Sequence, residues 1–141
     1  MAFPLNAANL IPQKVPIVLV DRLLKSDEEK SVSDFEIRED CIFVKDGVLV
    51  LAGLMENIAQ TCALRTGYNA MNRGGRVRVG VIGGVKQFTV SRFPAVGERL
   101  TTTVKEVLNM DPAMLFSAEI LVGGETVASG EMKVFLNDEE A

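Results

Sequence analysis

The stretch that decides the fold is GVLVLAGLMENIAQTCALRTGYNAMNRGG, residues 47–75. Between Val50 and Leu64 its only polar residues are Glu56, Asn57, Gln60 and Thr61. At about 100° per residue these four lie on one arc of a helix, with Glu56 at the edge of the arc. Most of the remaining circumference is apolar, so the sequence predicts one long helix over residues 50–73 that is wrapped by a sheet.

Length and composition bound the number of domains. The chain has 141 residues, 48% of them hydrophobic, which is enough for one well-buried core and too few for two ordinary domains. We therefore expect a single domain over residues 1–141. Its first 16 residues, which contain three prolines, read as an N-terminal arm because proline disfavours helix.

The sequence contains no evident targeting or membrane-spanning segment. Its longest apolar run, residues 47–55, is interrupted by Glu56 and is too short to span a bilayer. The N-terminus lacks the basic start and apolar core of a secretory signal. Cys41 and Cys62 are too few for a disulfide framework, and a reduced, cytoplasmic protein is expected.

The sequence contains no histidine. This absence excludes histidine-based acid–base chemistry, Ser-His-Asp and Cys-His nucleophile pairs, and metal sites with histidine ligands. The two cysteines are also too far apart in the sequence for a zinc motif. We expect no metal and no other cofactor.

Charge is distributed unevenly along a chain whose net charge is -4. Residues 57–97 contain no Asp or Glu, and their basic residues are Arg65, Arg73, Arg76, Arg78, Lys86 and Arg92. A basic surface on an acidic protein suggests an anionic partner, whereas the alternative is that these side chains are simply solvated. Nucleic acid is disfavoured because Tyr68, Phe88 and Phe93 form no stacking series.

Strand-like segments flank the helix on both sides. Before it, residues 17–24 are aliphatic and β-branched, and residues 32–37 form a second strand that is expected to pair with the first, with a bulge where the alternation breaks. After it come four strand-like segments, residues 77–90, 100–108, 114–122 and 126–135. The glycine pair at 123–124 between the last two is a hairpin signal. This order predicts an α+β fold with an antiparallel sheet curled around the helix. We expect a dimer, since so small a sheet leaves a face or edge open.

Three motifs give the chain a resemblance to a known family. LIPQKVPIVLVDRLL (residues 10–24), ENIAQ (56–60) and FTVSRFPAVGERL (88–100) occur in the order seen in β-hydroxyacyl-acyl-carrier-protein dehydratases of the hotdog fold. The chain more closely resembles the divergent hotdog subunit of aryl-polyene biosynthesis, in FVKDGVLVLAGLMENIAQ (43–60) and VRVGVIGGVKQFTVSRFP (77–94). The resemblance implies a hotdog fold, a hotdog dimer, and a role in fatty-acid or polyene-type synthesis.

The resemblance also implies two catalytic groups. One is a carboxylate on the central helix followed by Ala-Gln, which Glu56 and Ala59-Gln60 match, with Gln60 as a supporting residue. The other is a histidine in a Gly-His-Phe-Pro loop, whose place falls at Ile42 when the sequence is counted back without gaps. Dehydration needs a base for the C2 proton and an acid for the departing hydroxyl. The chain thus departs from the family pattern at one of these two groups.

Other residues are candidates for binding the ligand. Asn57 and Phe88 are expected to contact an acyl thioester, and glycines 80, 83 and 84 to let its pantetheine arm lie against a strand. Simple strand curvature is the alternative for the glycines. The residues expected to dock an acidic acyl carrier protein are Arg73, Arg76, Arg78 and Arg92.

Three functions remain open at this point. The first is a partner subunit of a dehydratase assembly, in which a histidine-bearing hotdog subunit supplies the missing base. The second is an acyl-CoA or acyl-carrier-protein thioesterase in which Glu56 activates water. The third is a homodimeric dehydratase with an unorthodox site. The alternative for Glu56 is a buried carboxylate that is kept for structure and paired with an arginine of a partner chain or with backbone donors.

Overall fold

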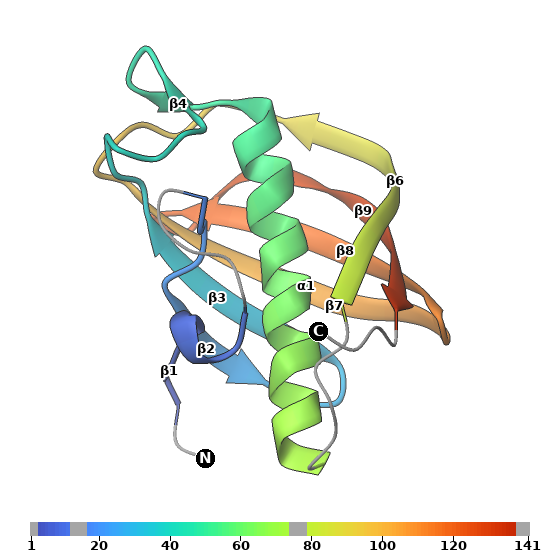
Figure 1. The fold of residues 1–141 in the computed structure, drawn as a ribbon. Helices are drawn as coiled ribbons and strands as arrows, with labels where there is room; N and C mark the ends of the chain where they lie inside the picture. Colours follow the sequence, from blue (N-terminus) through green and yellow to red (C-terminus); the bar gives the residue numbers. More distant parts are fainter. Residues whose placement is uncertain (1–2, 12–16, 74–78, 138–141) are drawn as a thin grey trace.

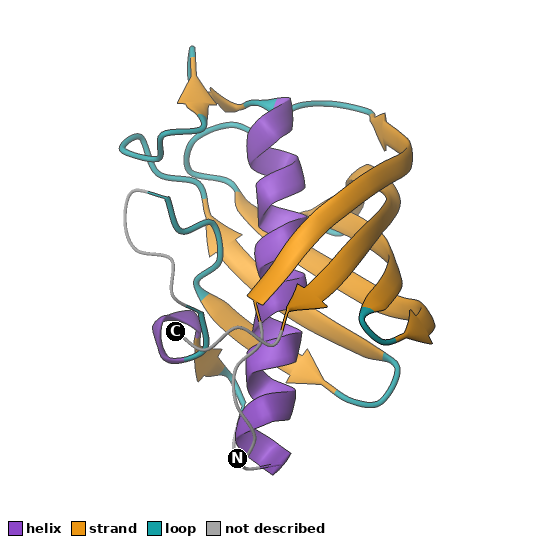
Figure 2. Ribbon diagram, turned by 45° about the vertical axis from the view of Figure 1, so that its right-hand side comes forward, coloured by secondary structure: helices purple, strands orange, loops and turns teal. Residues whose placement is uncertain are grey.

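The helix predicted from residues 50–73 is present almost as expected. In a computed structural model of the chain, which describes residues 3–11, 17–73 and 79–137, α1 runs Leu51–Arg73. It crosses the concave side of one large antiparallel sheet (Figure 1). Figure 2 shows strands on one side curling in front of the helix. The predicted α+β architecture is confirmed.

The sheet has seven strands in the order β1-β2-β3-β7-β8-β9-β6, and every pair is antiparallel. Their bounds are Leu5–Asn6 (β1), Arg22–Ser26 (β2), Lys30–Glu36 (β3), Arg99–Met110 (β7), Ala113–Val122 (β8), Glu125–Asn137 (β9) and Val79–Val90 (β6). A separate small hairpin joins Val44–Lys45 (β4) to Val48–Leu49 (β5). Strand β6, the first strand after the helix, therefore lies at an edge of the sheet.

The predicted hairpins are confirmed. Strand β2 pairs with β3, and β8 pairs with β9 across Gly123 and Gly124. Both glycines have positive φ angles, 57° and 82°, as a tight two-residue hairpin turn requires. The bulge lies in β2, between Leu23 and Lys25, rather than at the irregular positions of β3.

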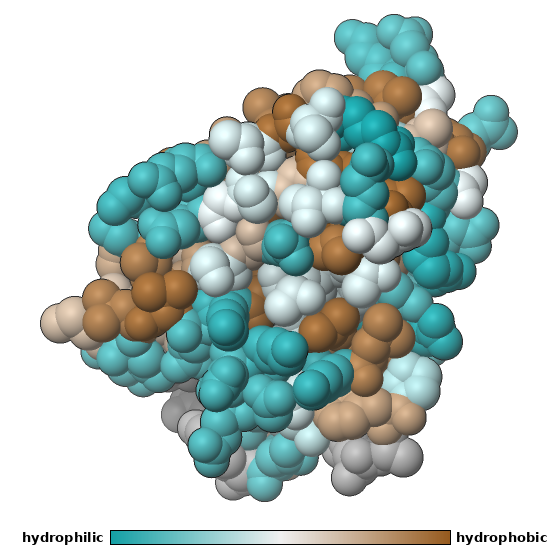
Figure 3. Space-filling view, turned by 180° about the vertical axis from the view of Figure 1, so that it is seen from behind, coloured by the Kyte–Doolittle hydropathy of each residue, from teal (hydrophilic) through white to brown (hydrophobic). Residues whose placement is uncertain are grey.

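Most of the core lies between the helix and the sheet. Alternate residues of each strand face inward, as in β8, where Met114, Phe116, Ala118 and Ile120 are buried. They pack with Leu54 and Ile58 of α1 in one cluster. The opposite, convex face of the sheet carries many hydrophilic side chains with apolar patches among them (Figure 3).

The N-terminal residues do more than the predicted arm. Ala7–Asn9 forms a 3₁₀ helix, η1, and Ala7, Leu10 and Ile11 are buried in a second apolar cluster against Leu64 of α1. The approach is close at Gly67, where a Cβ would lie 2.4 Å from the carbonyl oxygen of Leu10. Residues 7–11 therefore pack against α1 at Leu64 and Gly67.

The first predicted strand, residues 17–24, is only partly correct. Strand β2 begins at Arg22, and residues 17–20 belong to no strand. The aliphatic character of this segment reflects burial, because Leu19 and Val20 are almost fully buried. Residues 39–46, between β3 and the helix, contain strand β4 of the small hairpin.

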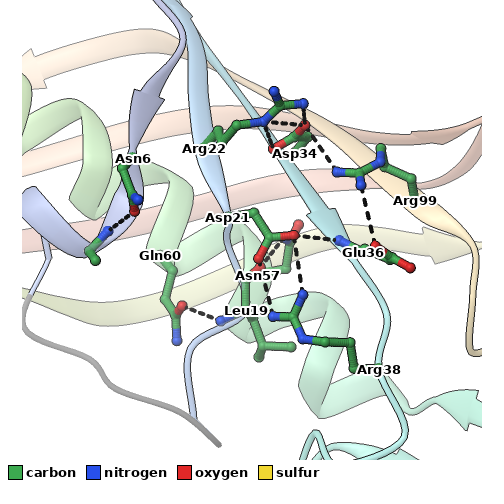
Figure 4. A network of polar contacts seen from close by, with 11 residues as sticks. Asn6, Leu19, Asp21, Arg22, Asp34, Glu36, Arg38, Asn57, Gln60 and Arg99 are labelled. Atoms are coloured by element: carbon green, nitrogen blue, oxygen red, sulfur yellow. Dashed lines mark hydrogen bonds and ion pairs between the residues drawn. The ribbon is translucent and has the colours of Figure 1, made fainter.

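Ion pairs join three strands on the convex face. Asp34 of β3 has a side chain only 2% exposed, and it pairs with Arg22 of β2 and, at 3.1 Å, with Arg99 of β7 (Figure 4). Asp21 accepts hydrogen bonds from Arg38 in the same network. Each carboxylate here is matched by a guanidinium, so the network holds the strands together and leaves little net charge.

Candidate functional site

A cleft of about 280 Å³ lies between α1 and the edge strand β6. The helix lines it with Glu56, Ala59, Gln60, Cys62, Ala63 and Thr66, and the sheet lines it with Gly80, Val81, Ile82, Val134 and Leu136. The helical residues recur every three or four positions and therefore share one face. Small side chains on that face and a glycine opposite them leave room for a ligand.

Glu56 is the only carboxylate that lines this cleft among the described residues. It is partly buried, and Gln60 Nε2, one turn further along α1, donates a hydrogen bond of 2.9 Å to its Oε2. Residues four apart on a helix face each other, which permits this contact. The carboxylate is thus oriented by an amide donor within the lining of the cleft.

Gln60 is itself fixed from the other side. Its Oε1 accepts a hydrogen bond from the Leu19 backbone N–H at 2.7 Å (Figure 4). Its Nε2 also donates to the Ile17 carbonyl at 3.1 Å. The side chain is 1% exposed. An extended segment far away in the sequence therefore sets the position of the group that orients Glu56.

Asn57 does not line the cleft. It is fully buried, its Nδ2 donates to the Leu19 carbonyl at 2.7 Å, and its Oδ1 accepts a hydrogen bond of 2.6 Å from the Thr102 hydroxyl. Both atoms of its amide are thus used inside the protein. This geometry gives Asn57 the task of holding residues 17–20 and β7 against α1.

Two ionisable side chains, Glu56 and Cys62, are among the described residues that line the cleft, and only Glu56 is suited to proton transfer. Cys62 also lines the cleft, but complete burial raises the pKa of its thiol to about 12, with a smaller opposing effect from Arg65. The thiol therefore stays protonated and is a poor nucleophile. The described lining residues offer Glu56 alone as an acid or base.

The other predicted catalytic and substrate-binding positions lie outside this cleft. Ile42 is 56% exposed in the turns before β4. Phe88 is partly buried and packs against the main core, and also against Gly130. None of Ile42, Gly83, Gly84 and Phe88 is among the residues that line the cleft.

The glycines of β6 differ from one another. Gly80 lines the cleft. A Cβ at Gly83 would lie 2.2 Å from the ring of Phe135, so this glycine makes room for an aromatic side chain. Gly84 has no atom near its missing Cβ, and a bulge separates it from Ile82. The strand is irregular at these glycines, Gly80 alone lines the cleft, and the contact of a pantetheine arm with them stays a prediction.

Two arginines of the basic segment 57–97, Arg65 and Arg92, are already paired within the chain and are therefore less available to bind an anionic partner. Arg92 is paired with Glu98 at 2.9 Å and with Glu125 at 3.4 Å, so its charge is largely neutralised. Arg65 is buried and bonds to Glu106, to Ser31 and to two backbone carbonyls. Arg76 and Arg78 lie outside the described residues, as does the side chain of Arg73. Docking of a carrier protein by these arginines stays a prediction.

Sequence reasoning passed over several residues that line the cleft. Thr66, Val81, Ile82 and Leu136 belong to it. The position of Thr66 could have been found, because it continues the three- and four-residue spacing of Glu56, Ala59 and Ala63. The strand residues could not, because their place depends on which edge of the sheet approaches the helix.

Neither a group of metal ligands nor a membrane-spanning helix occurs among the described residues. They contain no group of three His, Cys, Asp or Glu residues that could hold a metal ion. Within the same residues, no helix has the length and apolar character needed to cross a membrane.

Comparisons with known proteins identify relatives of the whole chain. The family model described as "ApeP-like: ApeP dehydratase" matches residues 5–141. The structure is similar to the dehydratase heterocomplex ApeI:P from Xenorhabdus doucetiae, with a TM-score of 0.89 and 17% identity, over 99% of this chain and 94% of that one. A search of proteins with curated functions finds no match.

Two further solved structures share the architecture. One is the PaaI protein of Escherichia coli, from the phenylacetic acid degradation operon, with a TM-score of 0.64 and 15% identity, covering 80% of each chain. The other is a hypothetical thioesterase with coenzyme A from Streptococcus pneumoniae, with a TM-score of 0.65 and 13% identity, covering 84% of this chain and 87% of that one. At such identities the likeness shows the fold, which is the hotdog fold.

Proposed function

The chain belongs to the ApeP-like dehydratase family, and from this premise we propose that it is one subunit of a β-hydroxyacyl-thioester dehydratase assembly. In this proposal it contributes the acyl-binding cleft and the carboxylate of Glu56. A histidine-bearing hotdog subunit contributes the second catalytic group. The substrate is an acyl chain carried on an acyl carrier protein or on coenzyme A, in a fatty-acid or aryl-polyene pathway of the cytoplasm.

One observation carries this proposal: the described residues that line the cleft include one oriented carboxylate and no second group suited to proton transfer. Elimination of water from a β-hydroxyacyl thioester requires removal of a C2 proton and protonation of the departing hydroxyl. Glu56, held by Gln60 at 2.9 Å, can perform one of these steps. Because the sequence has no histidine and the described lining of the cleft offers no other such group, we assign the other step to a group of a second chain.

The cleft lies at a sheet edge, where a second chain can contribute residues to the same site. It lies against β6, an edge strand whose Val81 and Ile82 are 48% and 41% exposed. An edge strand presents unpaired backbone groups that another strand can bind. A partner that adds to this edge would cover the two apolar side chains and bring its own residues next to Glu56. The similar Xenorhabdus structure, which is a heterocomplex of dehydratase subunits, is consistent with such an arrangement.

The test is a comparison of three preparations with β-hydroxyacyl thioesters as substrates. The isolated chain, the histidine-bearing subunit and their complex are assayed for enoyl product. We expect turnover by the complex that neither subunit reaches alone. Glu56→Gln should lower the turnover of the complex by about 10²–10⁴-fold, the usual contribution of one positioned acid or base.

The matched control is Glu119→Gln, which changes an exposed carboxylate on β8, outside the cleft. This variant should leave turnover unchanged. If the histidine-bearing subunit alone is as active as the complex, or if Glu56→Gln behaves like Glu119→Gln, the catalytic part of the proposal is wrong.

A thioesterase is the second candidate, favoured by the same carboxylate. Hydrolysis of a thioester needs one group to activate water, and Glu56 could do this without histidine. In the same assay, free thiol released from saturated acyl thioesters by the isolated chain, and lost in Glu56→Gln, would establish this function. Enoyl product formed by the isolated chain would instead indicate a homodimeric dehydratase.

A further inference from the structure

The convex face of the sheet carries a row of apolar side chains near the turn between β7 and β8. Four strands contribute one residue each, and each residue lies directly opposite the next: Val81 (β6), Phe135 (β9), Ala113 (β8) and Met110 (β7). Residues directly opposite each other in antiparallel strands share a face, with Cβ atoms about 4.5–5.5 Å apart. The row is therefore continuous, and Phe135 and Met110 are 39% and 66% exposed.

A second row widens this apolar surface. Leu115 of β8 lies opposite Leu108 of β7 on one side and opposite Lys133 of β9 on the other. Leu108 is exposed and Leu115 is partly buried. The residues of the two rows are two positions apart along each strand and share the convex face, where apolar side chains gather among hydrophilic ones (Figure 3). We call five of these residues the convex patch: Leu108, Met110, Ala113, Leu115 and Phe135.

A bulge in β7 turns two residues of the patch outward. The register shifts between Glu106 and Leu108, so Val107 is an extra residue on this strand. Because side chains alternate along a strand, Leu108 and Met110 would face the same side as Glu106 without the extra residue. Glu106 faces α1, where it accepts a hydrogen bond from Arg65. The bulge therefore moves two large apolar side chains from the concave to the convex face.

The concave side of the same hairpin is used within the fold. Glu106 and Asn109 line a second cleft there, of about 660 Å³, together with Arg65 and Thr66 of α1. Glu106 accepts hydrogen bonds from Arg65 Nε and from Asn109 Nδ2, both at 3.1 Å. These polar groups already have partners in the chain. The exposed apolar side chains of the convex patch still leave their surface to water.

The ring of Phe135 is held in place on the convex face. A Cβ at Gly83 of β6 would lie 2.2 Å from this ring, so the absence of a side chain at Gly83 gives the ring its room. The ring remains partly exposed although it packs against the neighbouring strand. A contiguous exposed apolar surface of this kind marks an interaction site more often than scattered apolar residues do.

Charges of both signs border the convex patch. Lys133 lies in its second row, and Lys105 and Glu131 lie one row further, on either side of Ser117. None of these three charged groups forms an ion pair with another described residue. A surface with an apolar centre and unpaired charges of both signs is complementary to itself, since a two-fold rotation can bring a lysine of one copy to Glu131 of the other.

The second subunit of the proposed assembly leaves the convex patch open. A strand added to β6 extends the sheet sideways and does not cover its face. Strand β7 is the third strand from that edge, about 14 Å away at about 4.7–4.9 Å per strand. The patch is therefore available in the isolated chain and in the assembly alike.

We propose that a second copy of this chain binds the convex patch, so that two sheets pack face to face about a two-fold axis. Sheets packed in this way lie about 10 Å apart, with side chains from both faces filling the space between them. Leu108, Met110 and Phe135 supply these side chains. None of the five residues of the patch lines the Glu56 cleft, so the contact joins two assemblies without changing the site.

The first test measures mass by sedimentation equilibrium from micromolar to submillimolar concentration. In the complex with the histidine-bearing subunit, where β6 is occupied, we expect two copies of each chain. Leu108→Lys places a charge within the patch and should raise the dissociation constant of the contact tenfold or more. Glu119→Lys changes an exposed charge on the same face, outside the patch, and should leave the mass unchanged. Turnover of the complex should be the same for both variants.

The second test locates the contact by crosslinking the isolated chain. Both natural cysteines are buried, so the thiol of Ala113→Cys is the one that a short bismaleimide reaches. We expect a covalent dimer of Ala113→Cys and no dimer of the wild type. Adding Leu108→Lys to Ala113→Cys should abolish the crosslink, while thermal unfolding shows that the variant is folded.

The outcomes separate this inference from the proposed function. One copy of each chain in the complex at every concentration, or equal masses for Leu108→Lys and Glu119→Lys, would overturn the inference and leave the proposed function intact. If no complex with the histidine-bearing subunit forms, the proposed function is wrong and the crosslink decides the inference alone. A crosslink that Leu108→Lys abolishes then supports it, and a missing or unaffected crosslink overturns it.

Discussion

Two sides of α1 carry polar residues, and they are used in opposite ways. On the side toward residues 17–20 and β3, the side chains of Asn57, Gln60, Thr61 and Arg65 are buried and bonded within the chain, and Gln60 and Arg65 also form part of cleft walls. On the side toward β6, Glu56 and Thr66 line open clefts. We call these the closed side and the open side.

The difference teaches how one helix can serve stability and function together. A buried polar group that has partners stabilises one arrangement of the chain, and the loss of a single partner is costly. A polar group that lines a cleft can also bind a ligand, even where, as in Glu56 and Thr66, it already has one partner within the helix. Changes on the closed side should therefore affect folding, and changes on the open side should affect binding and catalysis.

The largest effect is expected from Arg65→Met on the closed side. The variant leaves Glu106 and the carbonyls of Asp27 and Glu28 without their donor. Removing one partner of a buried pair costs about 3–5 kcal/mol, and we expect the lower end, about 3 kcal/mol, because Glu106 is partly exposed. Urea denaturation measures the free energy of unfolding. A loss below about 1 kcal/mol would show that the closed side is less dependent on Arg65 than its contacts suggest.

Asn57→Ala should have the next largest effect. It removes the donor to the Leu19 carbonyl and the acceptor for the Thr102 hydroxyl, both in fully buried surroundings. With about 1–3 kcal/mol for each unsatisfied buried group and some relaxation, we expect a loss of about 2 kcal/mol in the free energy of unfolding. Asn137→Ala, at an exposed position at the end of β9, is the control and should change little. Equal effects of the two variants would contradict the comparison.

Glu56→Gln, on the open side, should change the free energy of unfolding by less than about 0.5 kcal/mol. The amide keeps the shape of the carboxylate, and its oxygen can still accept the hydrogen bond from Gln60. Thermal and urea unfolding of the variant test this expectation. A destabilisation similar to that of Asn57→Ala would place Glu56 on the closed side and would favour a structural role for it.

The smallest effect is expected from Arg92→Ala, at the exposed ion pairs beyond β6. Arg92, followed by the Ala95 backbone N–H, lowers the pKa of Glu98. A lowered pKa in the folded state stabilises the protein above the ordinary carboxylate pKa of about 4.3, and this contribution is lost as the pH falls through the folded-state value.

Urea denaturation at neutral and at acid pH tests this prediction. The small difference in unfolding free energy between wild type and Arg92→Ala should be present at pH 7 and should shrink as Glu98 becomes protonated. A difference that stays constant down to pH 3 would show that the pairs of Arg92 do not stabilise the fold through Glu98.

Several features of the fold could be predicted from local patterns. The helix was placed within one residue, because its apolar circumference and polar arc persist over residues 50–64, about four turns. The hairpin at Gly123-Gly124 followed from backbone conformations that glycine adopts readily. Residues 17–20 were predicted as part of a strand because they are aliphatic and β-branched. In the structure the backbone of Leu19 is instead held by the side chains of Asn57 and Gln60, about forty residues away, and no local pattern reveals such contacts.

The sequence by itself determined the long helix, the position of Glu56 at the edge of its polar arc, and the absence of histidine, because these depend only on helical periodicity and residue identity. Only the tertiary structure decided which polar residues meet a cleft. That choice depends on the non-local pairing of β6 with β9, which places a sheet edge beside Glu56 and Thr66, and on the packing that buries Asn57 inside the protein.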